Sequence, residues 1–146
     1  MSIVKYIYLV DDDTDDQEFF VEAIRGLQNV HLYGLANNGK EALDQLFNSG
    51  MLPDYIFMDF NMPVMNGIEC LAELIKKPIT KNIPVFMLST ASEQSELCKK
   101  LGAKGFIKKS ADMNALRNQL DSIIVKNLTI NFVVTDEDCV KQHSSR

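Results

Sequence analysis

The sequence lacks the features that mark several classes of protein. Its three cysteines, Cys70, Cys98 and Cys139, are widely spaced and form no Cys-x-x-Cys pair, so neither a disulfide framework nor a zinc site is expected. No apolar run approaches the roughly 20 residues that span a bilayer, and the first residues lack the pattern of a signal peptide. These absences predict reduced thiols in a soluble, cytoplasmic protein without a membrane partner.

An excess of positive charge is also missing. The chain of 146 residues has 15 Lys and Arg against 20 Asp and Glu, which gives a formal net charge of -5 at pH 7. Because nucleic-acid backbones are bound by basic patches, direct nucleic-acid binding is not expected. The hydrophobic content of 46% and the charged content of 24% are those of an ordinary globular protein of one domain.

Short apolar runs alternate with amphipathic stretches along most of the chain. The apolar runs cover 4–10, 30–35, 55–58, 84–88 and 105–107, and the amphipathic stretches cover 14–27, 39–50, 67–76, 90–101 and 113–125. Thr14 with Gln17, and Thr90 with Glu93, have capping-box spacing and predict two helix starts. Acids 13, 15, 16 and 18 are interpreted as helix-start and surface residues.

Five strand–helix pairs in succession predict an α/β protein whose parallel sheet is covered by helices on both faces. Right-handed crossovers favour a doubly wound, flavodoxin-like sheet with the strand order 2-1-3-4-5. In that order the first and third strands are neighbours, and ligands bind beyond the carboxyl ends of the strands.

Residues 128–146 lie outside this alternation. A weak period-two pattern from Leu128 to Thr135 predicts either an extra edge strand or a strand exchanged between protomers, followed by a frayed tail. We expect one domain over 1–127 and a C-terminal extension over 128–146. The apolar side of the last helix and this tail also favour a homodimer.

Acidic residues follow two of the predicted strands. Asp11 and Asp12 follow the first strand, and Asp59 follows the third. Under the predicted strand order these carboxylates meet at one rim, where their mutual repulsion raises their pKa values unless a cation neutralises them. Mg²⁺ is the natural candidate, since it binds a few carboxylates together with water and phosphate oxygens. The backbone carbonyl of Asn61 would add a further oxygen ligand.

Polar residues also follow the fourth and fifth strands, at Ser89 and Lys109. A metal beside Asp59 suggests a phosphate site, in which an aspartate carboxylate can act as the nucleophile. Lys109 would place a positive charge on the phosphoryl oxygens, and the Ser89 hydroxyl would donate a hydrogen bond to them.

Four segments in this order resemble the receiver domain of two-component response regulators. They are Val10-Asp11-Asp12, 59–63 with Gly67, 84–91 and 105–109. The resemblance covers about residues 3 to 126. It implies transfer of a phosphoryl group to Asp59 from a phosphohistidine on a histidine kinase or histidine phosphotransfer protein. It also implies a protein that catalyses only its own phosphorylation and dephosphorylation. The fourth and fifth helices and strands of such a protein would form a surface that binds a downstream protein.

The resemblance assigns roles to single residues by position. Asp11, Asp12, Asp59 and the Asn61 carbonyl would bind Mg²⁺, and Lys109 would contact the phosphate. Ser89 and Phe106 match the switch pair, in which the hydroxyl moves to the phosphate and the ring turns inward.

Two positions depart from the family pattern. Ser110 follows Lys109 where the family usually has a proline, often with a cis bond, and a cis bond before a residue other than proline costs about 3 kcal/mol. Thr90 stands where the family often has alanine or glycine, next to the phosphate. We expect Thr90, together with Asn61, to set the lifetime of the phosphorylated state.

Other functions share parts of this pattern. A Mg²⁺-dependent phosphatase with an aspartate nucleophile would need an Asp-x-Asp pair, which Asp59-Phe60-Asn61 does not provide. A flavin or nucleotide binder would need a glycine-rich loop after the first strand. A pseudo-receiver that binds partners without phosphorylation would be expected to have lost Asp12, Asp59 or Lys109. We therefore expect a stand-alone receiver without an attached output domain.

Overall fold

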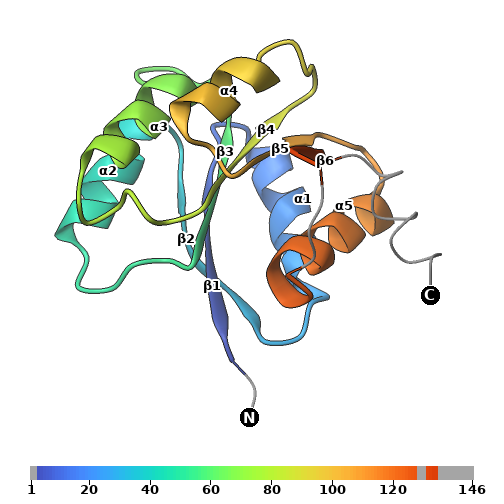
Figure 1. The fold of residues 1–146 in the computed structure, drawn as a ribbon. Helices are drawn as coiled ribbons and strands as arrows, with labels where there is room; N and C mark the ends of the chain where they lie inside the picture. The colour runs from blue at the N-terminus through green and yellow to red at the C-terminus, as the bar shows by residue number, and fades with distance from the viewer. Residues whose placement is uncertain (1–2, 128–130, 135–146) are drawn as a thin grey trace.

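The computed structural model describes residues 3–127 and 131–134, which form one parallel sheet with helices on both faces (Figure 1). In chain order the elements are β1 (Lys5–Val10), α1 (Thr14–Arg25), β2 (Val30–Ala36), α2 (Gly39–Asn48), β3 (Tyr55–Asp59), α3 (Gly67–Lys76), β4 (Val85–Ser89), α4 (Ser95–Leu101), β5 (Gly105–Lys108), α5 (Met113–Leu120), the π-helix η1 (Asp121–Val125) and β6 (Val133–Val134). The strand order is β2-β1-β3-β4-β5-β6. The predicted order 2-1-3-4-5 and the extra C-terminal strand are therefore confirmed.

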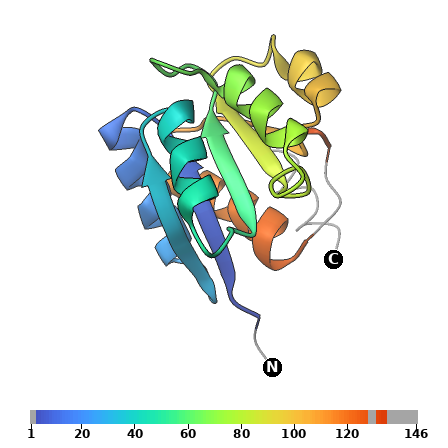
Figure 2. The same cartoon turned by 90° about the vertical axis from the view of Figure 1, so that its left-hand side faces the viewer.

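The central strands are buried on both faces because successive side chains point to opposite sides of a sheet. Ile7 and Leu9 of β1 face α1 and α5, whereas Tyr8 and Val10 face α2 and α3, and all four are fully buried. Figure 1 views the sheet near its edge, with these two helix layers on opposite sides, and Figure 2 shows the strands side by side. The chain thus has two hydrophobic cores, one on each side of the sheet.

The helix starts differ from the two predicted capping boxes. The N-cap of α1 is Asp13, whose side chain accepts a hydrogen bond from the Asp16 amide at 3.0 Å. Gln17 does not complete a box, because its side-chain amide donates to the Asp11 carbonyl instead. The prediction at Thr90 is also wrong, since α4 begins five residues later and its N-cap residue makes no side-chain capping bond.

The C-terminal strand β6 lies on the edge of β5, in the chain's own sheet. Val133 pairs with Phe106 and Val134 with Ile107, and the Phe106 amide donates to the Phe132 carbonyl at 2.8 Å. Val134 is fully buried. Among the two interpretations of the extension, the structure therefore has the edge strand; the rest of the predicted pattern and the tail, 128–130 and 135–146, lie outside the described residues.

Two further expectations concern the backbone and the membrane. Across the described ranges 3–127 and 131–134, every peptide bond is trans, including the one between Lys109 and Ser110. Within the same ranges, none of the helices combines the length and the apolar character needed to cross a bilayer.

Candidate functional site

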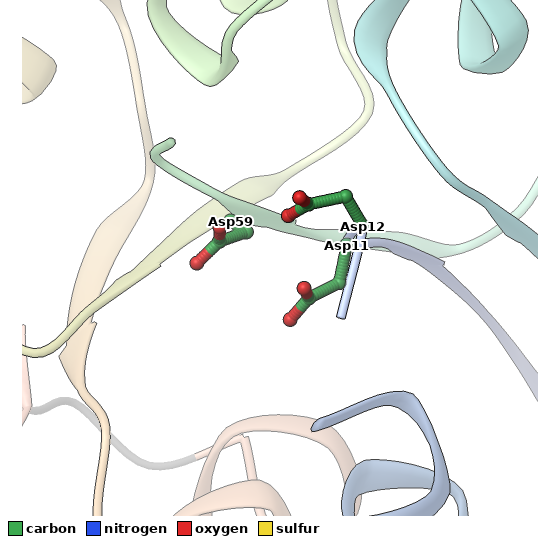
Figure 3. A group of neighbouring side chains, drawn as sticks. All are labelled: Asp11, Asp12 and Asp59. Carbon is green, nitrogen blue, oxygen red and sulfur yellow. The ribbon is translucent and has the colours of Figure 1, made fainter. Parts of the chain in front are cut away.

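The carboxyl ends of β1 and β3 bring three carboxylates together. Asp11 and Asp12 follow the last residue of β1, and Asp59 is the last residue of the neighbouring strand β3. One oxygen of each carboxylate lies within 4.8 Å of the other two, and Figure 3 shows the three side chains at the adjoining strand ends. Asp11 and Asp59 are buried, whereas Asp12 is exposed. The predicted cluster at the rim of the sheet is therefore present.

Backbone hydrogen bonds past the strand ends fix this rim. The Asp11 amide donates to the Ala36 carbonyl at 2.9 Å, and the Lys109 amide donates to the Ser89 carbonyl at 2.7 Å. The loop after Asp59 folds back on itself, because the Gly67 amide donates to the Phe60 carbonyl at 3.0 Å. The site residues are thus carried by continuations of the sheet, which restricts their relative movement.

Lys109 neutralises part of this negative charge. Its Nζ lies 2.7 Å from Asp59 Oδ1, 2.8 Å from Asp16 Oδ2 and 3.3 Å from Asp11 Oδ2. Its side chain is only 22% exposed, so these ion pairs are less screened by solvent than pairs on the surface. The predicted proximity of Lys109 and Asp59 is therefore present in the structure.

Burial raises the pKa values of the two inner carboxyl groups. The pKa of Asp11 rises to about 6, because burial outweighs the hydrogen bond from the Asp13 amide and the charge of Lys109. Burial also raises the pKa of Asp59, although the hydrogen bond and the charge of Lys109 act in the opposite direction. Burial alone would lower the pKa of Lys109, but its hydrogen bonds to Asp16 and Asp59 raise it.

Asp16 is a member of the site that sequence reasoning missed. The sequence predicts a helix-start acid at this position, but the Asp16 carboxylate lies 2.8 Å from Lys109 Nζ, against 2.7 Å for Asp59. A signal was present in the sequence. Residues 16, 20 and 23 share one helix face, and Phe20 and Ala23 on that face are buried.

The remaining predicted residues lie around the cluster. Ser89 ends β4, half-buried, and its Oγ accepts a hydrogen bond from the Ala91 amide at 3.3 Å. Thr90 and Asn61 are exposed in the loops that follow β4 and β3. Phe106 is fully buried, on the sheet face that packs against α2, α3 and α4. Their roles in switching and in phosphate lifetime stay predictions.

A family model described as the response regulator receiver domain matches residues 7–121. A protein-glutamate methylesterase/protein-glutamine glutaminase of Bacillus subtilis (strain 168) is 30% identical over 128 residues, which cover 82% of this chain and 34% of that protein. The chain spans about a third of the length of the first curated relatives it matches.

Solved structures show the same similarity. The phosphorylated cyanobacterial phytochrome response regulator RcpA matches with a TM-score of 0.76 at 28% identity, covering 87% of this chain and 98% of that one. The Mn²⁺-bound form of the response regulator Rcp1 matches with a TM-score of 0.73 at 25% identity, covering 87% and 99%. Both similarities extend over nearly the whole of the matched chains.

Proposed function

Since this chain belongs to the response regulator receiver domain family, we propose that it accepts a phosphoryl group on Asp59 from a phosphohistidine. The donor would be a histidine kinase or a histidine phosphotransfer protein in the cytoplasm. The observation that carries the proposal is the contact of 2.7 Å between Lys109 Nζ and Asp59 Oδ1, beside the carboxylates of Asp11 and Asp12.

Mg²⁺ fits the donor set of this site. Three carboxylates, those of Asp11, Asp16 and Asp59, surround the ammonium group of Lys109, and the Asp12 carboxylate lies beside those of Asp11 and Asp59. Four negative charges and one positive charge leave a net charge of -3, and the raised pKa of Asp11 reflects this poorly compensated burial. A divalent cation would be held by Asp11, Asp12 and Asp59, and the Asn61 carbonyl would complete its protein ligands. When bound, it supplies positive charge next to the phosphoryl oxygens.

Residues at this rim supply both the nucleophile and a positive charge for the transfer. A carboxylate oxygen of Asp59 attacks phosphorus, the N–P bond to the donor histidine breaks, and the electron pair of that bond leaves with the imidazole. Lys109 stays within reach of the phosphoryl oxygens and balances the charge that they bring. The same attack on acetyl phosphate would break an O–P bond and release acetate.

The output is proposed to be a change in a protein-binding surface. Receiver domains of this family act between histidine kinases and downstream targets, and here Ser89 and Phe106 would couple the phosphate to the surface around α4, β5 and α5. The chain would thus modify only itself. A pseudo-receiver that binds partners without phosphorylation is the second candidate. One observation favours it: the ring of Phe106 is already fully buried in this structure, whereas a switch ring would be expected to turn inward only on phosphorylation.

Intact mass after incubation with acetyl phosphate and Mg²⁺ tests the proposal. We expect one phosphate adduct on the wild-type chain and none on Asp59→Asn. Asp44→Asn, an exposed position on α2, is the matched control and should take up phosphate like the wild type. A wild-type chain that remains unmodified while correctly folded would contradict the proposal and favour the pseudo-receiver.

Thr90→Ala is expected to shorten the lifetime of the phosphorylated state several-fold. Thr90 is exposed directly after Ser89, where its side chain would hinder the approach of water to the acyl phosphate. Thr90→Val is the control, because it keeps the shape of the side chain and removes only the hydroxyl group. The decay of the phosphate adduct after removal of the donor gives the lifetime, and an unchanged decay in Thr90→Ala would refute a steric role.

A further inference from the structure

Lys109 is shared by three carboxylates, and one of them lies outside the predicted site. Its ammonium group has three protons to donate, and Asp59, Asp16 and Asp11 lie 2.7, 2.8 and 3.3 Å from its Nζ. All three donor positions are therefore taken before a phosphoryl group arrives. For Lys109 to bind a phosphoryl oxygen, at least one carboxylate must give up its hydrogen bond.

Asp16 is held in place by its helix. Its amide donates to the N-cap side chain of Asp13 at 3.0 Å, and one turn further along α1 the buried Phe20 packs against Phe57 of β3 with the ring centroids 5.3 Å apart. The Asp16 side chain itself is 46% exposed. Its carboxylate is thus fixed near Lys109 by a rigid helix, while solvent can replace the ion pair when Lys109 moves.

We propose that Asp16 is a positioning residue for Lys109. Asp16 competes with the phosphoryl donor for the ammonium group of Lys109 and so slows phosphate uptake. The inference rests on the proposed function. Asp16 acts in two ways, and both slow phosphate uptake. It holds one proton of Lys109 that a phosphoryl oxygen would otherwise accept, and it adds a negative charge that repels an anionic donor.

The neighbouring residue provides a matched control. Asp15 lies in the same first turn of α1 and is exposed, and none of the ion pairs or hydrogen bonds in the described part of the chain joins it to Lys109. Asp15→Asn therefore makes the same change in net charge as Asp16→Asn, at nearly the same place, without touching the contact at 2.8 Å.

Phosphorylation kinetics with acetyl phosphate at saturating Mg²⁺ test the proposal. We expect Asp16→Asn to lower the acetyl phosphate concentration that gives the half-maximal rate by about threefold or more, which is the effect of one unit charge roughly 6 Å away in water. The maximal rate should change less. Asp15→Asn should behave like the wild type.

A second measurement does not depend on phosphorylation. Urea unfolding of Asp16→Asn, Lys109→Ala and the double variant gives the coupling between the two residues. We expect a coupling of at least about twofold in the folding equilibrium constant, and none when Asp15→Asn replaces Asp16→Asn. A side chain that only supported the helix start would stabilise α1 equally with or without Lys109.

The possible outcomes separate this inference from the function on which it rests. If the wild type is phosphorylated on Asp59 but Asp16→Asn matches Asp15→Asn, or is slower, the positioning role is refuted and the function stands. Absence of coupling to Lys109 refutes it as well. A wild-type chain that takes up no phosphate overturns both.

Discussion

Replacing Gly67 by alanine is expected to destabilise the protein by about 3 kcal/mol or more and to abolish phosphate uptake on Asp59. Gly67 is the first residue of α3 and is buried under the end of β3. A Cβ at this position would overlap the Asp59 carbonyl oxygen and lie 2.7 Å from Met87 Cε. The side chain of Met87 can move aside, whereas the carbonyl is part of the strand that carries the phosphoacceptor. Relief of the overlap therefore displaces Asp59 from its neighbours.

Gly50→Ala is the matched control for this change. No atom lies within 4 Å of a Cβ built on Gly50, so the same added methyl group should leave both properties unchanged. Urea unfolding measures the stability, and intact mass after incubation with acetyl phosphate and Mg²⁺ measures the uptake. If Gly67→Ala kept both the stability and the phosphate adduct of the wild type, the backbone at Asp59 would have to be more adaptable than the structure indicates.

The architecture and the residues at the strand ends could be predicted from the sequence because both depend on simple periodicities. The apolar runs gave the strands, and the strand order then determined which carboxyl ends are neighbours. Asp11, Asp12 and Asp59 meet for that reason, and so do the ends of β4 and β5, where Ser89 and Lys109 lie. These parts of the site follow from backbone positions alone.

The parts that could not be predicted depend on the direction of single side chains. Asp13 and Thr14 are both good N-cap residues, and only the folded chain shows that Asp13 accepts the bond from Asp16. The helix period places Asp16 on the buried face of α1, but its contact with Lys109 also depends on the conformations of the two side chains. At Thr90 the segment forms the loop after β4 instead of a helix start, and within this loop Ser89 Oγ accepts a hydrogen bond from the Ala91 amide.

The stability of the metal-free protein is expected to fall as the pH rises from about 4 to about 7. The pKa of Asp11 is about 6 in the folded chain, against an ordinary value of 3.8, so the folded state holds this proton more tightly than the unfolded chain does. The stabilisation is complete below the ordinary value and is lost as the pH rises through about 6. For Asp11 alone the difference amounts to about 3 kcal/mol, and the raised pKa of Asp59 acts in the same direction.

Mg²⁺ should reverse this loss at neutral pH, because the ion binds the deprotonated carboxylates and takes the place of the protons. Urea unfolding at pH 5 and pH 7.5, with Mg²⁺ or with EDTA, measures both effects. We expect the stabilisation by Mg²⁺ to be larger at pH 7.5 than at pH 5. In Asp11→Asn, which carries no titrating group at that position, the stability of the metal-free chain should depend less on pH. Lys109 does not interfere, since its raised pKa keeps it charged throughout this range. The opposite result, a metal-free chain that becomes more stable between pH 5 and pH 7.5, would contradict this prediction. It would show that the charge of Lys109 stabilises the ionised carboxylates by more than burial destabilises them. The site would then not need a divalent cation to balance its charge.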